Sequence, residues 1–235
     1  MLRPIRLMLA CLCGGLGLAG IVASAYAGDM TLTSEITGST AFHVPVKSFK
    51  ELKFVHTLHQ QVDYSCGAAA IATLLTYSYG KPVAERTVLQ DMLDHGDKQV
   101  IQTKGFSLLD IRNYLARQGL QSGGYRLPLD KIPEVAVPGI VLINHNGYNH
   151  FVVVDGFKDG RLLLADPSLG ARTVDVDTFK REWTGVYFVI LTGADDARRK
   201  FNLKEDWSLQ GHGTWDRFRD TFDLARLSFK SADAF

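Results

Sequence analysis

The sequence lacks three features that would narrow its class at once: an excess of charge, a long apolar run after its first thirty residues, and a set of paired cysteines. Lysine and arginine number 26 against 25 aspartate and glutamate, so the formal net charge is +1. That balance predicts neither a nucleic-acid groove nor a strongly acidic partner. The mature chain is not expected to span a membrane. Hydrophobic residues still make up 46% of the 235 residues, which is enough for one packed domain with extra segments at its ends.

The first 27 residues have the pattern of a secretory signal. Arg3 and Arg6 precede an apolar run over residues 7–22, and the Ala-Tyr-Ala of residues 25–27 supplies small side chains where a signal peptidase reads them. We therefore predict cleavage after residue 27 and export to the periplasm. The alternative is an uncleaved membrane anchor, which the length of the apolar run disfavours.

Removal of the signal would leave a single cysteine. Cys11 and Cys13 lie inside the predicted signal, so only Cys66 remains in the mature chain. Exported proteins meet oxidising conditions, in which thiols are normally paired or absent. A lone cysteine there is either a catalytic nucleophile or a buried, inert core residue, and by itself it favours neither.

Helical patterns come first along the chain and strand patterns follow. An alanine- and leucine-rich stretch over 66–79 is apolar on nearly every face, which predicts a buried helix. Further helices are expected over 83–94 and from Ser107, an N-cap with Asp110 three residues on, to Gly119. This order predicts an α+β domain whose N-terminal helices pack on an antiparallel sheet. The expected strands, the first three separated by Asn-Gly and Asp-Gly turns, are 139–143, 150–154, 161–165 and 186–191.

Two end segments differ from this domain. Residues 28–52 are polar with short apolar alternations, and we interpret them as a lead-in strand or loop. Residues 193–235 form a tail that is charged at first and then aromatic. A periodic apolar face is first of all a packing face, so the tail is expected to pack back onto the domain. The aromatics that keep helical spacing in it are Trp215, Phe218 and Phe222.

Cys66 stands where a loop enters the first predicted helix. The positive end of a helix dipole and its free backbone N–H groups favour an anion, and the thiolate is the nucleophilic form of cysteine. Gly67 lets a substrate backbone approach closely. Gln60, six residues upstream, is a candidate donor of a side-chain amide to an oxyanion.

A thiolate needs a nearby acid to protonate the leaving amine, and histidine is the usual choice. His150 opens one predicted strand and Asp166 ends the next. If these strands pair through the turn at residues 158–160, the start of one lies beside the end of the other, so Asp166 is expected next to the His150 imidazole. His145 is the alternative base, but we expect it in a turn rather than on a strand.

Metal binding is the less favoured interpretation of the histidines that precede the cysteine. His56, His59 and Cys66 are all ligand types, but zinc sites usually show a second close ligand pair and none stands out. We therefore predict no metal and no cofactor. Tyr148 and Trp183 are expected either to line a substrate groove or to pack as ordinary aromatics.

Three blocks of the sequence resemble the C39 family of cysteine peptidases: residues 60–70, 150–154 and 165–167. The resemblance covers roughly residues 53–192. It implies a papain-like cysteine peptidase fold with a Cys-His-Asp triad in this chain order. The positions that match the family's triad and oxyanion glutamine are Cys66, His150, Asp166 and Gln60, with Gln61 as the neighbouring alternative for the last.

The family resemblance also implies a substrate class. Members typically cut leader peptides after a small-residue pair, often Gly-Gly. The best-known members are fused to an exporter with an ATP-binding domain, but this sequence contains no G-x-x-x-x-G-K-[ST] phosphate loop. It is more similar to stand-alone, signal-bearing members such as the peptidase of the bacterial functional-amyloid (Fap) secretion system. The implied function is an exported endopeptidase that processes a secreted polypeptide or leader peptide, with an amyloid subunit and secretion-system components as partners.

Two other functions are compatible with the same residues. One is a non-catalytic docking or chaperone module for a secretion system. The presence of all three reactive residue types argues against it. The other is an acyltransferase, in which the acyl group passes to an amine instead of water. Fold and triad do not separate this activity from hydrolysis, because the choice of acceptor depends on the shape of the groove.

Overall fold

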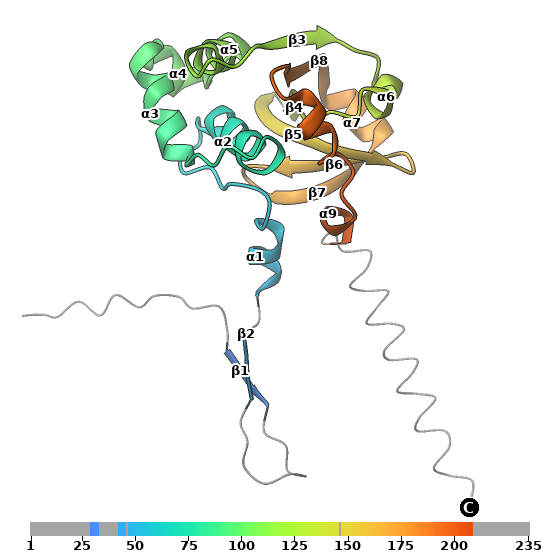
Figure 1. The fold of residues 1–235 in the computed structure, drawn as a ribbon. Coiled ribbons are helices and arrows are strands. Elements are labelled where there is room, and N and C mark those ends of the chain that lie inside the picture. The colour runs from blue at the N-terminus through green and yellow to red at the C-terminus, as the bar shows by residue number, and fades with distance from the viewer. Residues whose placement is uncertain (1–28, 33–41, 46, 146, 209–235) are drawn as a thin grey trace, which may run out of the picture. The chain divides into compact units, whose positions relative to one another are not determined.

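The chain divides into two units, residues 1–46 and 47–235. Within the first unit, β1 (Asp29–Leu32) pairs antiparallel with β2 (Phe42–Pro45). No helix in the described part of the chain is long and apolar enough to cross a membrane. The computed structural model describes residues 29–32, 42–45, 47–145 and 147–208 (Figure 1).

The predicted signal at residues 1–27 lies outside these described residues, and so do the tail aromatics Trp215, Phe218 and Phe222. The predictions made for them stay predictions. The part of the lead-in that belongs to the second unit contains a short helix, α1 (Phe49–Lys53), which begins with a capping box between Ser48 and Glu51.

The second unit is built around one buried helix. The predicted helix over 66–79 is present as α2 (Cys66–Thr73), which continues as the π-helix η1 (Leu74–Ser78). Every residue of α2 is buried. Its small alanine side chains let neighbouring elements approach from several directions, as a helix without a polar face requires. The helices that follow it are α3 (Glu85–His95), α4 (Lys98–Lys104) and α5 (Leu108–Arg117).

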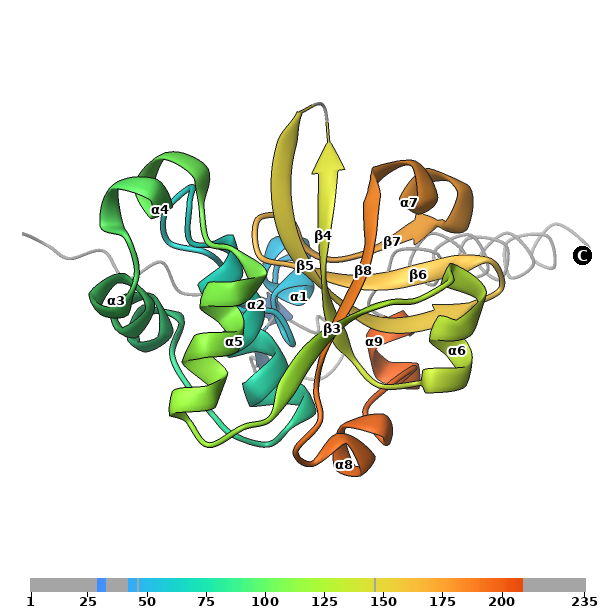
Figure 2. The same cartoon turned by 90° about the horizontal axis from the view of Figure 1, so that it is seen from above.

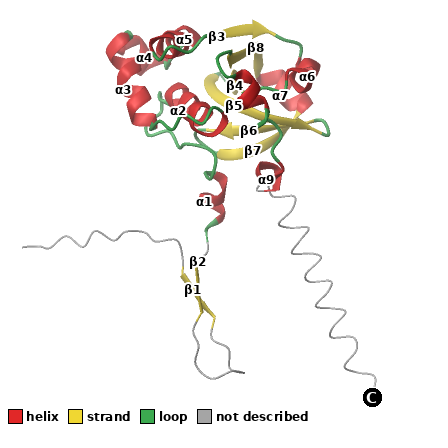
Figure 3. Cartoon of the chain, in the orientation of Figure 1, coloured by secondary structure: helices red, strands yellow, loops and turns green. Residues whose placement is uncertain are grey.

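A six-stranded sheet follows these helices along the chain (Figures 2 and 3). Its strand order is β3-β8-β4-β5-β6-β7, and every neighbouring pair is antiparallel. The predicted α+β class, with helices packed on an antiparallel sheet, is confirmed. The strands are β3 (Ser122–Arg126), β4 (Gly139–His145), β5 (Tyr148–Lys158), β6 (Arg161–Asp166), β7 (Gly170–Asp175) and β8 (Trp183–Ile190).

Both faces of the central strand β5 are covered. Phe151 and Val153 belong to the core shared with α2, whereas Val152 and Val154 belong to a second core on the other face. A strand that alternates between two cores has no polar face, which is why residues 151–154 are an uninterrupted apolar run. The short helices of the second half of the chain are η2 (Leu129–Lys131), α6 (Ile132–Val135), α7 (Val176–Glu182), α8 (Ala194–Arg198) and α9 (Lys204–Ser208).

The described part of the tail returns to the sheet. Ala197 and Phe201 are buried in the second core. The Asn202 side chain accepts a hydrogen bond from the Phe157 N–H at 2.7 Å and donates one to the Phe157 carbonyl at 3.0 Å. These contacts tie the segment around Asn202 to the second half of β5.

The β5–β6 hairpin turns where the sequence predicts it. Asp159 and Gly160 have φ values of +51° and +70°, the left-handed geometry that a two-residue hairpin turn requires. The strands then pair up to Val153 opposite Ala165, with an irregularity in the register at Asp155. This pairing sets the end of β6 beside the beginning of β5.

Candidate active site

Cys66 is the first residue of α2, as the sequence predicts. It is buried, with a relative exposure of 4%. The preceding Ser65 is also buried, and its hydroxyl donates a hydrogen bond to the Val62 carbonyl at 2.9 Å and accepts one from the Val62 N–H at 3.3 Å. These bonds close the loop ahead of the helix and fix the direction from which the chain enters it. The thiol therefore stands at the end of a helix whose first N–H groups have no partner within the helix.

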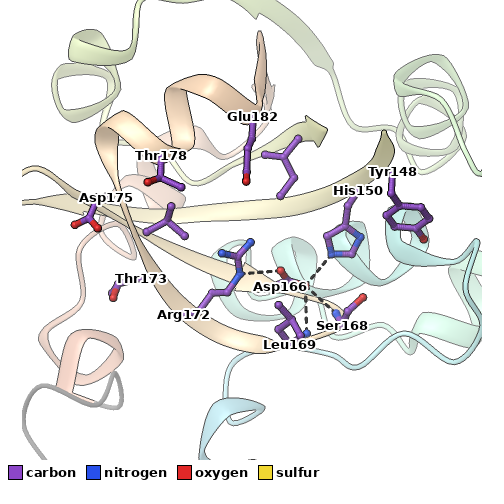
Figure 4. Close-up of a pocket in the computed structure, with 12 residues that line it drawn as sticks. Tyr148, His150, Asp166, Ser168, Leu169, Arg172, Thr173, Asp175, Thr178 and Glu182 are labelled. Atoms are coloured by element: carbon purple, nitrogen blue, oxygen red, sulfur yellow. Dashed lines mark hydrogen bonds and ion pairs between the residues drawn. The ribbon is translucent and has the colours of Figure 1, made fainter. Parts of the chain in front are cut away.

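His150 and Asp166 meet across the β5–β6 hairpin (Figure 4). His150 Nε2 and Asp166 Oδ1 are 2.7 Å apart, and the two residues are buried, at 7% and 1% exposure. The juxtaposition that the predicted hairpin requires is therefore present. The described residues offer no hydrogen bond of normal geometry to His150 Nδ1, yet the Cys66 thiol lies close enough to act on the imidazole. The ring thus has the Asp166 carboxylate at Nε2 and the Cys66 thiol among its neighbours.

The charge state of His150 is set by opposing effects. Burial lowers the pKa of His150, because a charged imidazole loses solvation. Hydrogen bonds to Asp166 and Cys66, together with the charges on both, outweigh that loss and raise the pKa of His150 to about 9. The imidazolium form is therefore favoured at neutral pH.

Asp166 is held by four donors. Its Oδ1 accepts hydrogen bonds from the backbone N–H groups of Ser168 and Leu169, at 2.9 and 3.2 Å, in addition to the bond from His150. Arg172 Nε donates to Oδ2 at 2.9 Å. Burial raises the pKa of Asp166, but the bond and charge of His150, the Ser168 N–H and the charge of Arg172 lower it to about 2. The carboxylate is fixed in position and stays ionised.

Arg172 is the side chain bound to Asp166 that sequence reasoning misses. It belongs to β7, a strand that the sequence patterns do not predict, since its residues Gly-Ala-Arg-Thr-Val-Asp do not alternate cleanly. The weak signal available is an arginine six residues after a candidate catalytic aspartate. That signal gains meaning only when β7 folds back antiparallel to β6, with Gly170 opposite Asp166.

Gln60 lies near the site, with its side chain engaged in the loop. Its amide nitrogen donates to the carbonyls of Val62 and Asp63, at 3.2 and 3.4 Å, and its carbonyl oxygen accepts from the Ser168 hydroxyl at 2.8 Å. It therefore links the segment ahead of Cys66 to the turn that holds Asp166. Gln61 is exposed, and its backbone N–H points to Glu85 at 3.4 Å.

Tyr148 connects the start of β5 to the loop ahead of Cys66. Its hydroxyl donates to the Asp63 carbonyl at 2.9 Å, and its ring stacks near the His150 imidazole with centroids 6.2 Å apart. Burial and the charges of Cys66 and Asp63 raise the pKa of Tyr148. Of the two aromatics considered from sequence, Tyr148 lies at the site. Trp183 instead packs on Phe179.

The other histidines considered from sequence lie elsewhere. His56 contacts the Asp206 carboxylate and makes a tilted ring contact with Tyr77, and His59 faces Phe54. Within the described part of the chain, no group of three His, Cys, Asp or Glu side chains is arranged to hold a metal ion. The expectation for His145 needs correction: it is the last residue of β4 rather than part of the turn, because the β4–β5 pairing extends to His145 opposite Tyr148.

Comparison with known proteins assigns this arrangement to a class. The model of the peptidase C39 family matches residues 55–195, so the chain belongs to that family. It is a cysteine peptidase, with the papain-like fold that the resemblance implies.

Relatives of two kinds are similar to the chain. The probable functional amyloid protease FapD of Pseudomonas fluorescens is 36% identical, over 94% of this chain and 95% of its own length. FapD of Pseudomonas aeruginosa PAO1 is 32% identical, over 83% and 85%. The colicin V secretion/processing ATP-binding protein CvaB of Escherichia coli is 26% identical over 60% of this chain, but over only 19% of its own length.

Among solved structures, the double-glycine-motif protease of an AMS/PCAT transporter, in complex with its leader peptide, is 29% identical. It covers 57% of this chain and 89% of its own, with a TM-score of 0.49.

Proposed function

We propose that this chain is an exported endopeptidase in which Cys66 is the nucleophile, His150 is the acid and base, and Asp166 orients the imidazole. The observation that supports this assignment is the 2.7 Å contact between His150 Nε2 and Asp166 Oδ1, made while the Cys66 thiol is near enough to raise the pKa of His150. A nucleophile, its base and a group that orients the base is the arrangement that acyl transfer requires.

In the proposed reaction His150 first gives up one proton and later accepts another. The Cys66 thiolate attacks the scissile carbonyl carbon, and as the C–N bond breaks the His150 imidazolium gives its proton to the leaving amine. The acyl group is then bonded to sulfur. A water molecule attacks the same carbon while His150 accepts one of its protons. The C–S bond breaks, and the thiolate and the imidazolium are restored with release of a carboxylic acid product.

Gln60 is proposed to donate to the oxyanion together with a backbone N–H at the start of α2. Its amide must then exchange the carbonyls of Val62 and Asp63, to which it donates at 3.2 and 3.4 Å, for the substrate oxygen. The bond to Val62 is at the upper limit of the usual N–H···O range and the bond to Asp63 exceeds it, which favours exchange for a shorter bond to the oxyanion. Its anchor to Ser168 would keep the amide near the site.

Export and substrate follow from the sequence pattern and the relatives. We propose that residues 1–27 direct the chain to the periplasm, that residues 53–192 form the catalytic domain, and that residues 28–52 and 193–235 flank it. Two relatives of similar length are named as probable functional amyloid proteases. The proposed substrate is accordingly a secreted polypeptide, with an amyloid subunit as the first candidate and components of its secretion system as partners.

The test is replacement of the nucleophile in the full chain. Cys66→Ser and His150→Ala should abolish the appearance of new N-termini in the exported proteins, measured by mass spectrometry against a strain that carries the wild type. Labelling by a thiol-directed probe should be abolished in Cys66→Ser and slowed in His150→Ala. His95→Ala, which changes an exposed histidine on α3, serves as the matched control and should process normally. Normal processing by Cys66→Ser would refute the assignment.

A further inference from the structure

The Gln60 side-chain amide is bound through both its nitrogen and its oxygen. Its Nε2 donates to the carbonyls of Val62 and Asp63 at 3.2 and 3.4 Å, and its Oε1 accepts from the Ser168 hydroxyl at 2.8 Å. The backbone N–H of Gln60 also donates to the Pro167 carbonyl at 3.0 Å. The backbone of Gln60 is therefore fixed on the turn after β6, and its side-chain dihedrals set the direction in which the amide N–H groups point.

The two carbonyls that Gln60 contacts have other donors. The Val62 carbonyl also accepts from the Ser65 hydroxyl at 2.9 Å and from the Ser65 N–H at 3.0 Å. The Asp63 carbonyl accepts from the Tyr148 hydroxyl at 2.9 Å. Each carbonyl thus keeps a shorter hydrogen bond when the Gln60 nitrogen leaves it. The nitrogen can therefore change partner without leaving an acceptor unpaired, which is the costly outcome when hydrogen bonds are exchanged.

The bond to Ser168 is the shortest of the three that the amide makes. It binds the amide by its oxygen, which takes no part in stabilising an oxyanion, so it can persist while the nitrogen turns toward a substrate. Ser168 is itself held, because its backbone N–H donates to Asp166 Oδ1 at 2.9 Å (Figure 4). The turn that binds the Asp166 carboxylate therefore also fixes the point about which the Gln60 amide can rotate.

We infer that Ser168 is a positioning residue for the oxyanion donor: its hydroxyl holds Gln60 Oε1 as a pivot, about which the amide nitrogen turns from its two loop carbonyls to the substrate oxygen. The inference rests on the proposed function, because it needs Cys66 to attack a carbonyl and Gln60 to donate to the oxyanion that forms. A negatively charged oxygen is a stronger acceptor than a neutral carbonyl, so its formation draws the nitrogen away from the loop.

The experiment separates oxyanion formation from the reactivity of the thiol. Cleavage is measured on a peptide that the mature wild type cuts, taken from a digest of exported proteins. The aldehyde made from the residues before that cut is the inhibitor, since addition of the thiol places a tetrahedral oxygen where Gln60 donates. Alkylation of Cys66 by iodoacetamide is the reference, because the sulfur displaces iodide from a methylene carbon and no oxyanion forms.

We expect Ser168→Ala to lower kcat by about fivefold with little change in KM, the size of one neutral hydrogen bond. The inhibition constant of the aldehyde should rise by a similar factor, and the rate of alkylation should stay that of the wild type. Ser168→Thr keeps the hydroxyl and should restore most of kcat.

A double variant tests whether Ser168 acts through the amide. Gln60→Ala should lower kcat by about 10²-fold, as loss of one oxyanion donor does. Addition of Ser168→Ala to that variant should then cost nothing more. Ser208→Ala is the matched control, since it also removes a hydroxyl that donates one hydrogen bond from an exposed serine, here to the Glu205 carbonyl at 2.7 Å on α9. It should match the wild type in every measurement.

Four results would overturn the inference while Cys66 and His150 keep their proposed roles. They are an unchanged kcat in Gln60→Ala, an equal loss from Ser168→Ala with and without Gln60, a loss that Ser168→Thr does not restore, and slower alkylation in Ser168→Ala. The last would mean that the hydroxyl acts on the thiol or the imidazole. If the wild type cleaves no peptide of the digest, the proposed function fails and the inference fails with it.

Discussion

Two aspartates on the same hairpin show opposite behaviour. Asp166 ends β6 and has a pKa that burial raises but its hydrogen-bond donors lower to about 2. Asp155 lies in β5 at the irregularity of the register, and burial, with the charge of Asp206 adding to it, raises its pKa to about 7. Both lose solvation, yet one carboxyl is ionised in the fold and the other is near half-protonated at neutral pH.

The difference lies in what surrounds each carboxyl. Asp166 receives an imidazole, a guanidinium and two backbone N–H groups. Asp155 faces a cavity of about 200 Å³ that also holds His56 and Asp206, and those two pair with each other. Desolvation alone makes a buried carboxyl neutral, whereas oriented donors keep it charged. On this hairpin Asp166 is therefore surrounded by hydrogen-bond donors, whereas Asp155 is not.

The largest effect on activity is expected when the Asp166 carboxylate, which accepts four hydrogen bonds, is removed. Asp166→Asn should lower kcat/KM by about 10³-fold or more, because an amide neither fixes the imidazole in one orientation nor stabilises its cation. The alkaline limb of the pH profile, expected near 9 from the raised pKa of His150, should move toward 6.5. Peptide cleavage, or alkylation of Cys66, measured from pH 5 to 10 checks both.

Asp155→Asn is the matched control for that measurement. It makes the same chemical change on the neighbouring strand, outside the site, and should leave kcat/KM and the pH profile of the wild type. Equal losses in the two variants would mean that the difference between the two acids has no bearing on catalysis.

The second effect is on the free energy of unfolding. At neutral pH the raised pKa of Asp155 lowers it, whereas the lowered pKa of Asp166 raises it. The Asp155 pKa is raised from 3.8 to about 7, so below pH 4 both folded and unfolded chains are protonated and nothing is lost. As pH rises to 7 the unfolded chain ionises first, which destabilises the fold. Asp155→Asn removes that loss and should raise the free energy of unfolding by about 2 kcal/mol at pH 8, with little gain at pH 4.

Urea unfolding of the mature chain at pH 4, 6 and 8 measures this gain. Asp177→Asn, at an exposed position of α7, should follow the wild-type curve at every pH. A gain for Asp155→Asn that does not grow between pH 4 and pH 8 would show that its carboxyl is solvated in the fold.

The third effect tests Arg172 as a positioning residue for Asp166. Arg172→Met removes the 2.9 Å bond to Oδ2 and should lower kcat by about tenfold, the size of one charge-assisted hydrogen bond. The pKa of Asp166 should rise, so the acid limb of the pH profile moves upward. Arg172→Lys should restore part of the rate.

Arg161→Met is the control for this variant, since Arg161 on β6 has a similar exposure, 30% against 26%, and pairs with Asp175 at 3.4 Å. A change in KM alone, with the acid limb unmoved, would mean that Arg172 contacts substrate without positioning Asp166.

The comparison also separates what sequence patterns can predict from what they cannot. His150 and Asp166 are predictable because strand periodicity and an Asp-Gly turn fix the register of one local hairpin. The donors to Asp166 are harder to predict, because Arg172 stands on β7, whose mixed polar sequence becomes a strand only by pairing with β6. Glycine-rich β3 is missed for the same reason, since its pairing with β8 overrides its weak strand propensity.

The environment of Asp155 depends on still more distant contacts. Its backbone carbonyl accepts a hydrogen bond from Asn202 at 2.8 Å, and Asp206 reaches its pocket from α9. Nothing in the local pattern of β5 indicates that residues fifty positions later will cover it. By contrast α4, which the sequence interpretation omits, has a local signal, because Asp97 caps it by accepting from the N–H groups of Gln99 and Val100.

The smallest effect concerns access to the Cys66 sulfur, which lies near the start of β5 where His150 meets Asp166. Cys66 is 4% exposed, and the Tyr148 hydroxyl joins the start of β5 to the Asp63 carbonyl in the loop that leads to it. Tyr148→Phe removes one partly exposed hydrogen bond of about 0.7 kcal/mol and should raise the rate of Cys66 alkylation by iodoacetamide about threefold. Tyr125→Phe, an equally exposed tyrosine on β3, should not change it. An unchanged alkylation rate in Tyr148→Phe would mean that the sulfur is covered by packing around α2, and that this hydrogen bond does not control how a peptide reaches it.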